Sequence, residues 1–138
     1  MVSYIKKKFS YTIFMAILVM NFNCNDIGST PPASTSPVSF AQHVQPIFNN
    51  SCSCHSGNSP SAAMNLSAGS SYSQLVNVQS ASSCISLKRV LPSVADSSTL
   101  YRKISGSTCG AQMPQGGSIS SSSISIIGDW INQGAINN

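Results

Sequence analysis

The sequence predicts a small all-α domain of three to four short helices that long loops connect. Three observations predict this class. Apolar residues recur at helical spacing in four short stretches, no stretch of useful length alternates apolar and polar residues as a strand does, and serine, glycine and proline fill the segments between. The chain has 138 residues, which suits one domain better than two.

The first helix is expected at residues 39–50. Phe40, Val44 and Ile47 recur there at i, i+4 and i+7, so they share one helix face. Pro46 lies within this stretch, and proline has no backbone N–H to donate to the helix. We therefore expect Pro46 near the start of the helix or at a break in it.

Two further helices are expected at 70–78 and 94–105, where apolar residues again share one side. The helix at 94–105 begins with Asp96 and Ser97, whose side chains are typical N-caps. Both helices are short, and the loops before them are long for a compact domain unless something organises those loops.

The last helix is expected at 118–135, where isoleucines recur at i, i+3 and i+7. The serines at 120–123 supply candidate N-caps, and Gly134 is a natural stop. This is the longest periodic stretch of the folded part.

Residues 1–23 are typical of a secretory signal peptide. A patch of three lysines, Lys6 to Lys8, precedes the apolar run at 9–22. That run is shorter than the roughly 20 apolar residues that a membrane-spanning helix needs. Cleavage of a signal peptide is therefore preferred over a permanent transmembrane anchor.

Cys24 immediately follows the apolar run and resembles the lipidated first residue of a bacterial lipoprotein. Ordinary cleavage that leaves Cys24 as a spare thiol is the alternative. After lipidated Cys24, residues 24–37 form a polar, proline-bearing flexible tether, and the folded domain is expected at 38–138. The expected location is the cell envelope, on a membrane facing the periplasm or the cell surface, where cysteines can pair.

The charge excludes one class of partner. The formal net charge is +4 from seven basic and three acidic residues. Removal of the three lysines of the signal peptide leaves four basic residues against three acidic ones, a charge of +1. No basic stripe of the kind that binds nucleic acid remains.

The stretch "NNSCSCHSG" carries Cys52, Cys54 and His55. Cys-x-x-Cys-His attaches a c-type haem, and this run is one residue shorter. Ser51 stands where the first cysteine belongs, and one residue of α-helix rotates a side chain by about 100°. Cys52 therefore reaches the usual haem vinyl group only after local unwinding. Either Cys54 forms one thioether, or both cysteines do so from a distorted loop, and we favour the second.

A zinc site is the alternative interpretation of this cysteine pair. A tetrahedral structural site needs two further ligands, which Cys84, Cys109 or His43 could supply in principle. Those residues do not form a second clustered pair along the chain.

Two methionines of the folded part are candidates for a second iron ligand. Met64 follows His55 closely and is typical of a core side chain. Met113 lies in the glycine-rich run "CGAQMPQGG", where Pro114 stiffens the chain and glycines let the backbone pass close to a flat ring. A methionine thioether as the sixth ligand raises the haem potential.

Four segments now stand in a recognisable order: "FAQHVQPIFNNSCSCHSG", "RVLPSVADSSTLYRKISG", "CGAQMPQGG" and "IIGDWINQGAIN". Together they resemble the small class I cytochrome c domains of bacterial exported proteins. The resemblance implies a cytochrome c-like fold around one covalent haem c. It implies His55 as the proximal ligand, Met113 as the distal ligand and Cys54 as the secure thioether, and it leaves Cys52 in doubt.

The resemblance also implies a disulfide between Cys84 and Cys109, because family members carry cysteines in such places. Such a bond is worth roughly 3 kcal/mol on the chain-entropy model and would brace the loop of Met113. A bond that involves Cys52 is the alternative if haem does not consume that thiol.

Other side chains are candidates for supporting roles. Arg89, Arg102 and Lys103 are candidates to neutralise the haem propionates, and Trp130 to lie near them. His43 is interpreted as a solvated or core residue rather than a ligand.

The implied function is one-electron transfer with redox partner proteins, since both axial positions of the iron are filled and no open site is left for catalysis. The chain is therefore expected to be a carrier and not an enzyme. Two other classes remain: a haem-based enzyme or sensor with a labile Met113 ligand, and a non-haem structural or zinc-binding lipoprotein.

Overall fold

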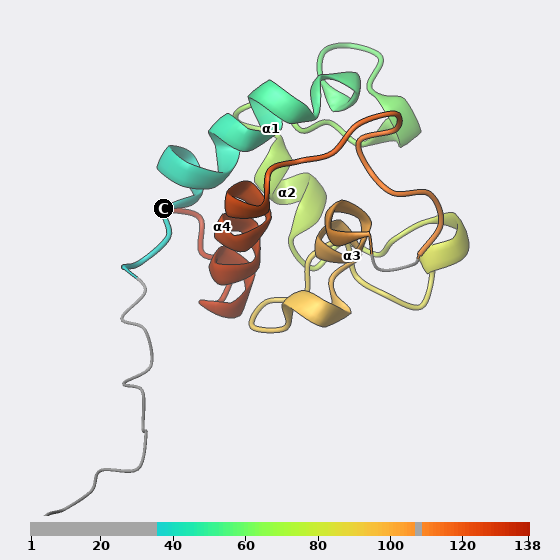
Figure 1. The fold of residues 1–138 in the computed structure, drawn as a ribbon. Coiled ribbons are helices and arrows are strands. Elements are labelled where there is room, and N and C mark those ends of the chain that lie inside the picture. Colours follow the sequence, from blue (N-terminus) through green and yellow to red (C-terminus); the bar gives the residue numbers. More distant parts are fainter. Residues whose placement is uncertain (1–35, 107–108) are drawn as a thin grey trace, which may run out of the picture. The chain divides into compact units, whose positions relative to one another are not determined.

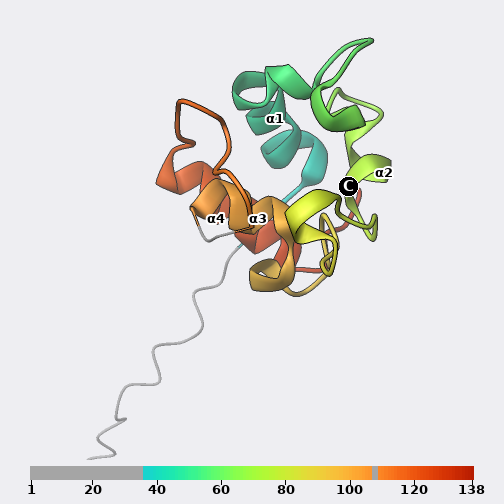
Figure 2. The ribbon, with the colours of Figure 1, turned by 90° about the vertical axis from the view of Figure 1, so that its right-hand side faces the viewer.

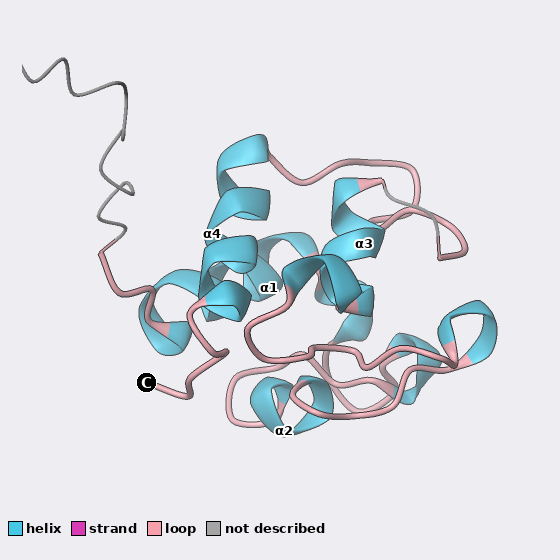
Figure 3. Cartoon of the chain, turned by 90° about the horizontal axis from the view of Figure 1, so that it is seen from below, coloured by secondary structure: helices cyan, strands magenta, loops and turns pink. Residues whose placement is uncertain are grey.

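Short helices joined by long loops make up the described part of the chain (Figures 1 and 3). The computed structural model describes residues 36–106 and 109–138. Its helical segments, with η marking short 3₁₀ helices and one π turn (η1), are η1 (Phe40–Val44), α1 (Gln45–Ser51), η2 (Ser53–His55), η3 (Ser61–Ala63), α2 (Ser71–Leu75), η4 (Ser82–Cys84), η5 (Ala95–Ser97), α3 (Thr99–Ser105) and α4 (Ser121–Asn132). Within those ranges strand pairing is limited to isolated bridges, so the predicted all-α class is confirmed for them.

The predicted signal peptide at 1–23 and Cys24 lie outside the described residues, and so does nearly all of the tether at 24–37. In the part of the chain that the structure describes, no helix is both long enough and apolar enough to cross a membrane.

The helix predicted at 39–50 is present, with the break that Pro46 requires. The segment begins as a wide π turn, in which the N–H of Gln45 bonds to the carbonyl of Phe40. Pro46 then occupies the first turn of α1, where its missing N–H removes no helical bond. Proline thus sets the point at which π winding gives way to α winding.

The helix predicted at 70–78 is shorter than expected. α2 ends at Leu75, because Val76 is extended and Asn77 has a positive φ of 61°. Val76 instead forms an isolated parallel bridge with Val90. Pairing with a distant segment therefore overrides local helical spacing at this point.

α3 begins later than predicted. Asp96 and Ser97, the expected caps, lie in the short helix η5, and α3 starts at Thr99 after the extended residue Ser98. The hydroxyl of Ser98 accepts a hydrogen bond from the N–H of Leu91 at 2.9 Å, so it is used to hold the preceding loop rather than to cap α3.

α4 confirms both of its predicted ends. The hydroxyl of Ser120 accepts the N–H of Ser123 at 3.2 Å and caps the helix. Beyond Asn132 the chain turns at Gly134, whose φ of +102° is unfavourable for any residue with a side chain.

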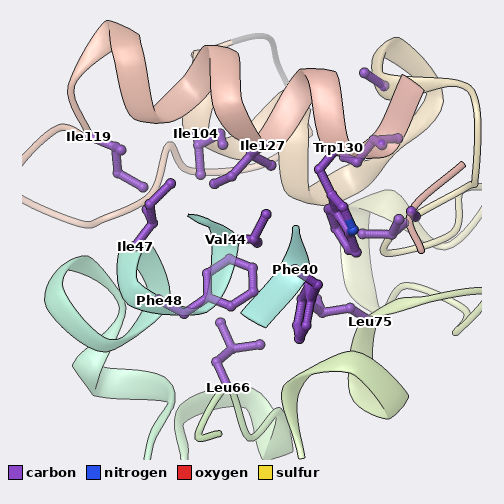
Figure 4. Packing of buried hydrophobic residues seen from close by; sticks show 14 residues of the cluster. Phe40, Val44, Ile47, Phe48, Leu66, Leu75, Ile104, Ile119, Ile127 and Trp130 are labelled. Atoms are coloured by element: carbon purple, nitrogen blue, oxygen red, sulfur yellow. The ribbon is translucent and has the colours of Figure 1, made fainter. Parts of the chain in front are cut away.

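The core lies between the η1–α1 segment and α4 (Figure 4). The ring of Trp130 is 1% exposed and stacks against Phe40 with centroids 5.1 Å apart. Its indole N–H donates to the carbonyl of Ile136 at 2.9 Å. The N–H of Ala41 donates to the carbonyl of Asn138 at 2.9 Å, which ties the first helix to the last described residues. These contacts hold together the side of the domain formed by η1, α1 and α4, and loops form the other side.

Candidate functional site

A single cavity brings together the four predicted haem residues. It has a volume of about 530 Å³, and Cys52, Cys54, His55 and Met113 all line it. Ligand sites in proteins have volumes of about 300–1,000 Å³ and mostly apolar walls. The other lining residues are Ser51, Ser61, Ala62, Met64, Leu66, Leu75, Ser80, Ala81, Ser83, Arg89, Thr99, Leu100, Lys103, Ile104, Pro114, Gln115 and Ile119.

Two irregular segments that are far apart in the sequence form opposite walls. Residues 52–66 carry the cysteines and His55, and residues 109–120 carry Met113. Figure 2 shows these two segments apart from each other, green and orange, above the helices α3 and α4. Both segments line the same cavity, which therefore lies between a histidine-bearing wall and a methionine-bearing wall.

The imidazole of His55 is fixed by the chain that follows it. Nδ1 lies 2.9 Å from the carbonyl oxygen of Ser61. A carbonyl can only accept a hydrogen bond, so Nδ1 carries a proton, and in the neutral ring Nε2 is then the nitrogen with a free lone pair. The carbonyl of His55 in turn accepts the N–H of Leu66 at 2.6 Å. The ring is thus held in the tautomer that an iron ligand requires.

The two cysteines of the motif are both unpaired but differ in surroundings. Cys52 is half-buried and packs against the hydrophobic core, whereas Cys54 is exposed. Burial raises the pKa of the Cys52 thiol, and the neighbouring Cys54 raises it further. The sequence predicts local unwinding here, and the structure differs: α1 ends at Ser51, and after Cys52 the chain tightens into the 3₁₀ segment Ser53–His55.

The loop of Met113 is held to the end of α3. The N–H of Met113 donates to the carbonyl of Lys103 at 2.9 Å, and the ammonium of Lys103 donates to the carbonyl of Ala111 at 3.2 Å. These two bonds position the methionine without any regular element of its own.

A disulfide adds a third connection to this loop. The sulfurs of Cys84 and Cys109 lie at bonding distance, and the Cα atoms are 5.5 Å apart, which suits a disulfide. This is the pair that the resemblance implies. Cys52 stays outside it, so the alternative pairing through Cys52 is not the one that the structure contains.

Replacing both Cys84 and Cys109 with serine is expected to lower the free energy of unfolding by about 3 kcal/mol, because the bond closes a loop with a sequence separation of 25. Urea denaturation of the wild type and of the double variant measures this change. Ser86→Ala, at an exposed position in the same loop, is the control and is expected to leave the unfolding midpoint unchanged. An unchanged midpoint in the double variant would show that the bond does not constrain the unfolded chain.

One wall of the cavity is polar. Arg89 and Lys103 line it, and Arg89 is held by a bond from Nη1 to the carbonyl of Gln74 at 2.8 Å. The buried hydroxyls of Ser80 and Thr99 lie 2.6 Å apart on the same cavity surface. The cavity therefore combines apolar walls with two cations and two hydroxyls, which suits a flat apolar group that bears carboxylates.

Two of the supporting candidates, Trp130 and Arg102, are not at the cavity. Trp130 lies in the core instead, where its indole N–H donates to the carbonyl of Ile136. Arg102 directs Nε to the carbonyl of Asp96, away from the lining residues. His43 is exposed and accepts the N–H of Ser39 on Nδ1, as expected for a solvated residue.

Sequence reasoning missed part of the lining. Met64 packs against the core, as expected, and its half-buried side chain also lines the cavity. The closeness of Met64 to His55 in the sequence was the only available signal. Ser80 and Thr99 carry no signal, because backbone bonds from their N–H groups to the carbonyls of Leu87 and Lys88 place them.

The donor set for zinc is incomplete in the described residues. Across 36–106 and 109–138, no three side chains from His, Cys, Asp and Glu lie close enough to hold one metal ion together. Cys84 and Cys109, two of the candidate zinc ligands, are bonded to each other.

A haem fits the chemistry of the cavity residues. His55 offers a free imidazole nitrogen, Met113 a thioether, and Cys52 and Cys54 offer unpaired thiols. Comparisons with protein-family models, with curated proteins and with solved structures find no match for this chain. The function therefore has to be inferred from these side chains and their placement.

Proposed function

We propose that this protein is a one-electron carrier that holds one covalent c-type haem in a class I cytochrome c-like fold. The observation that carries the proposal is the convergence of His55, Met113, Cys52 and Cys54 on one largely apolar cavity. These residues come from two segments that are distant in the sequence and have no other common role in the fold.

In this proposal, His55 and Met113 would be the two protein ligands of the haem iron. The Ser61 carbonyl holds a proton on Nδ1 of His55, so Nε2 would be the nitrogen that binds the iron. The Lys103 carbonyl and the disulfide of Cys109 keep the Met113 loop in place. A bound haem supplies reversible one-electron chemistry at its iron, and the apolar walls keep water from that iron.

Two protein ligands on the iron would favour a carrier over an enzyme. The carboxylates of the described residues, Asp96 and Asp129, do not line the cavity, so it contains no carboxylate to act as a general acid or base. A haem-based enzyme or sensor remains the second class to test, and it requires Met113 to be a weak ligand.

The proposal places the carrier at a membrane of the cell envelope. A lipid on Cys24 would anchor the chain, and the tether to residue 37 would let the domain reach redox partner proteins. The supporting pattern is the lysine patch, the apolar run and the cysteine that follows them.

Intact mass spectrometry tests the proposal. The protein is produced in a bacterial periplasm with the haem-attachment machinery, extracted with acid acetone and weighed. The expected product carries one haem that survives extraction. Correctly folded, colourless protein from the same host would refute the proposal, because the domain would then fold without a haem.

Arg89→Gln is expected to lower the reduction potential of the loaded protein. We propose that the Arg89 guanidinium pairs with a haem carboxylate, and removal of its positive charge favours the ferric state. A redox titration measures the change. Arg102→Gln is the matched control, because Arg102 does not line the cavity, and its potential is expected to stay at the wild-type value. Equal reduction potentials in the wild type and both variants would show that Arg89 does not pair with a haem carboxylate.

A further inference from the structure

Gln45 is a polar side chain buried between α1 and the loop that follows His55. It is 7% exposed, although its amide needs hydrogen-bond partners that water would otherwise supply. Nε2 donates to the carbonyl of Leu66 at 3.0 Å and to Oδ1 of Asn49 at 2.9 Å, and Oε1 accepts the hydroxyl of Ser71. A backbone carbonyl only accepts, so the Leu66 contact fixes which end of the amide faces the loop. Both hydrogens of the amide nitrogen and the amide oxygen therefore have partners.

A chain of hydrogen bonds runs from this amide through Leu66 to His55. The N–H of Leu66 donates to the carbonyl of His55 at 2.6 Å, and the carbonyl of Leu66 accepts from Gln45. The segment 61–66 thus meets His55 at both of its ends, since the carbonyl of Ser61 lies 2.9 Å from the ring nitrogen Nδ1. Gln45 holds the other side of Leu66 to α1.

The turn within segment 61–66 is strained. Ala62 has a φ of 55° and Ala63 a φ of 48°, in the left-handed region that residues with a side chain rarely adopt. Such a backbone persists only where the surrounding structure holds it. The hold comes from the ends of the segment, at Ser61 on the imidazole and at Leu66 on Gln45. Release of Leu66 is therefore expected to let the turn relax and to move the Ser61 carbonyl away from the ring.

Resting on the function proposed above, we propose that Gln45 is a positioning residue for the haem-ligating His55. Gln45 does not line the cavity, so it acts through Leu66 and the strained turn, which keep the Ser61 carbonyl on Nδ1. A hydrogen bond from Nδ1 makes the imidazole a more basic ligand, and a more basic ligand favours ferric over ferrous iron. Loss of the contact between Gln45 and Leu66 is therefore expected to raise the reduction potential.

Gln45→Met tests this role, because methionine has nearly the size of glutamine and no N–H to donate to Leu66. The haem-loaded protein is measured by redox titration and, in the ferric state, by electron paramagnetic resonance, whose g values depend on the orientation of the imidazole plane. Tyr72→Phe is the matched control. It also removes a donor to the carbonyl of a buried residue, Ala135 at 2.9 Å, but that carbonyl lies outside the segment that holds His55.

The expected shift is moderate. An outer partner of a metal ligand is worth about 10- to 100-fold in affinity or activity, and Gln45 acts one contact further out. At the wild-type midpoint we expect the ferrous-to-ferric ratio of Gln45→Met to be about threefold higher, a rise of about 30 mV at about 59 mV per tenfold, with changed g values. Tyr72→Phe is expected to lose stability and to keep the wild-type potential and g values. Wild-type values in Gln45→Met, or an equal shift in Tyr72→Phe, would overturn the positioning role.

Gln45→Asn is the second variant, because its amide is one methylene group too short to reach Leu66 while the site stays polar. The same shift of the potential and the g values is expected, and this variant decides the question if Gln45→Met does not load haem. If neither variant loads haem while Tyr72→Phe does, Gln45 holds the fold and not the ligand, which overturns the role. Wild-type protein without covalent haem would instead overturn the proposed function, so the two failures are distinguishable.

Discussion

Replacing both Cys52 and Cys54 with serine is expected to give a protein that carries no covalent haem and no longer unfolds cooperatively. The two thiols are the only unpaired cysteines in the described residues, so their loss leaves the cavity without an attachment point. Without the haem, the walls of a mostly apolar cavity of about 530 Å³ lose the contacts that the cofactor would make with them, in a small domain whose whole stability is only about 5–15 kcal/mol. The walls are therefore expected to collapse or to fill with water.

Circular dichroism during heating, on samples whose haem content is known from intact mass, measures this effect. Ser53→Ala is the matched control, because Ser53 is exposed between the two cysteines, and it is expected to load haem and unfold as the wild type does. A colourless double variant that unfolds cooperatively at the wild-type temperature would show that the helices hold the fold without the cofactor.

Local patterns predicted the parts of the fold that local forces determine. The cap at Ser120, the stop at Gly134 and the break at Pro46 follow from the chemistry of single side chains, and the structure confirms all three. The end of α2 and the start of α3 were missed because contacts outside each helix decide them. Val76 leaves α2 to pair with another segment, and the Ser98 hydroxyl binds the Leu91 N–H.

The candidate site was predictable only where a motif marks it. Cys54, His55 and Met113 stand in recognisable runs, and the structure brings them to one cavity. The 3₁₀ winding at Cys52 was not predictable, because three residues are too few for a periodic signal. The polar wall of the cavity, which contains Arg89, depends on how irregular segments pair with one another. The spacing of residues along the chain does not indicate that pairing.

Met113→Ala is expected to change the ligation of the haem iron more than any other single replacement on the methionine-bearing wall of the cavity. If Met113 is the sixth ligand, its loss opens an axial position and converts the ferric haem to the high-spin form. The reduction potential is then expected to fall on the order of 0.1 V or more, a fraction of the ~0.8 V range that axial ligands span. Absorption spectra of the ferric protein and a redox titration measure the two effects.

Met64→Ala is the matched control, because Met64 is a methionine that lines the same cavity. It lies on the His55 side of the chain, where the carbonyl of Ser61 accepts the N–H of Met64 at 3.2 Å, so its thioether is expected to pack rather than to ligate. The Met64 variant should keep the low-spin spectrum and the potential, and it should lose about 2 kcal/mol of stability through lost packing. If the two variants exchange these behaviours, Met64 is the ligand. If both keep a low-spin spectrum, neither methionine is required for ligation.

A Met113 variant that is high-spin and gains reactivity with peroxide would show that the Met113 thioether is what keeps this haem a carrier, since the same cavity with one open axial position would act as a catalyst.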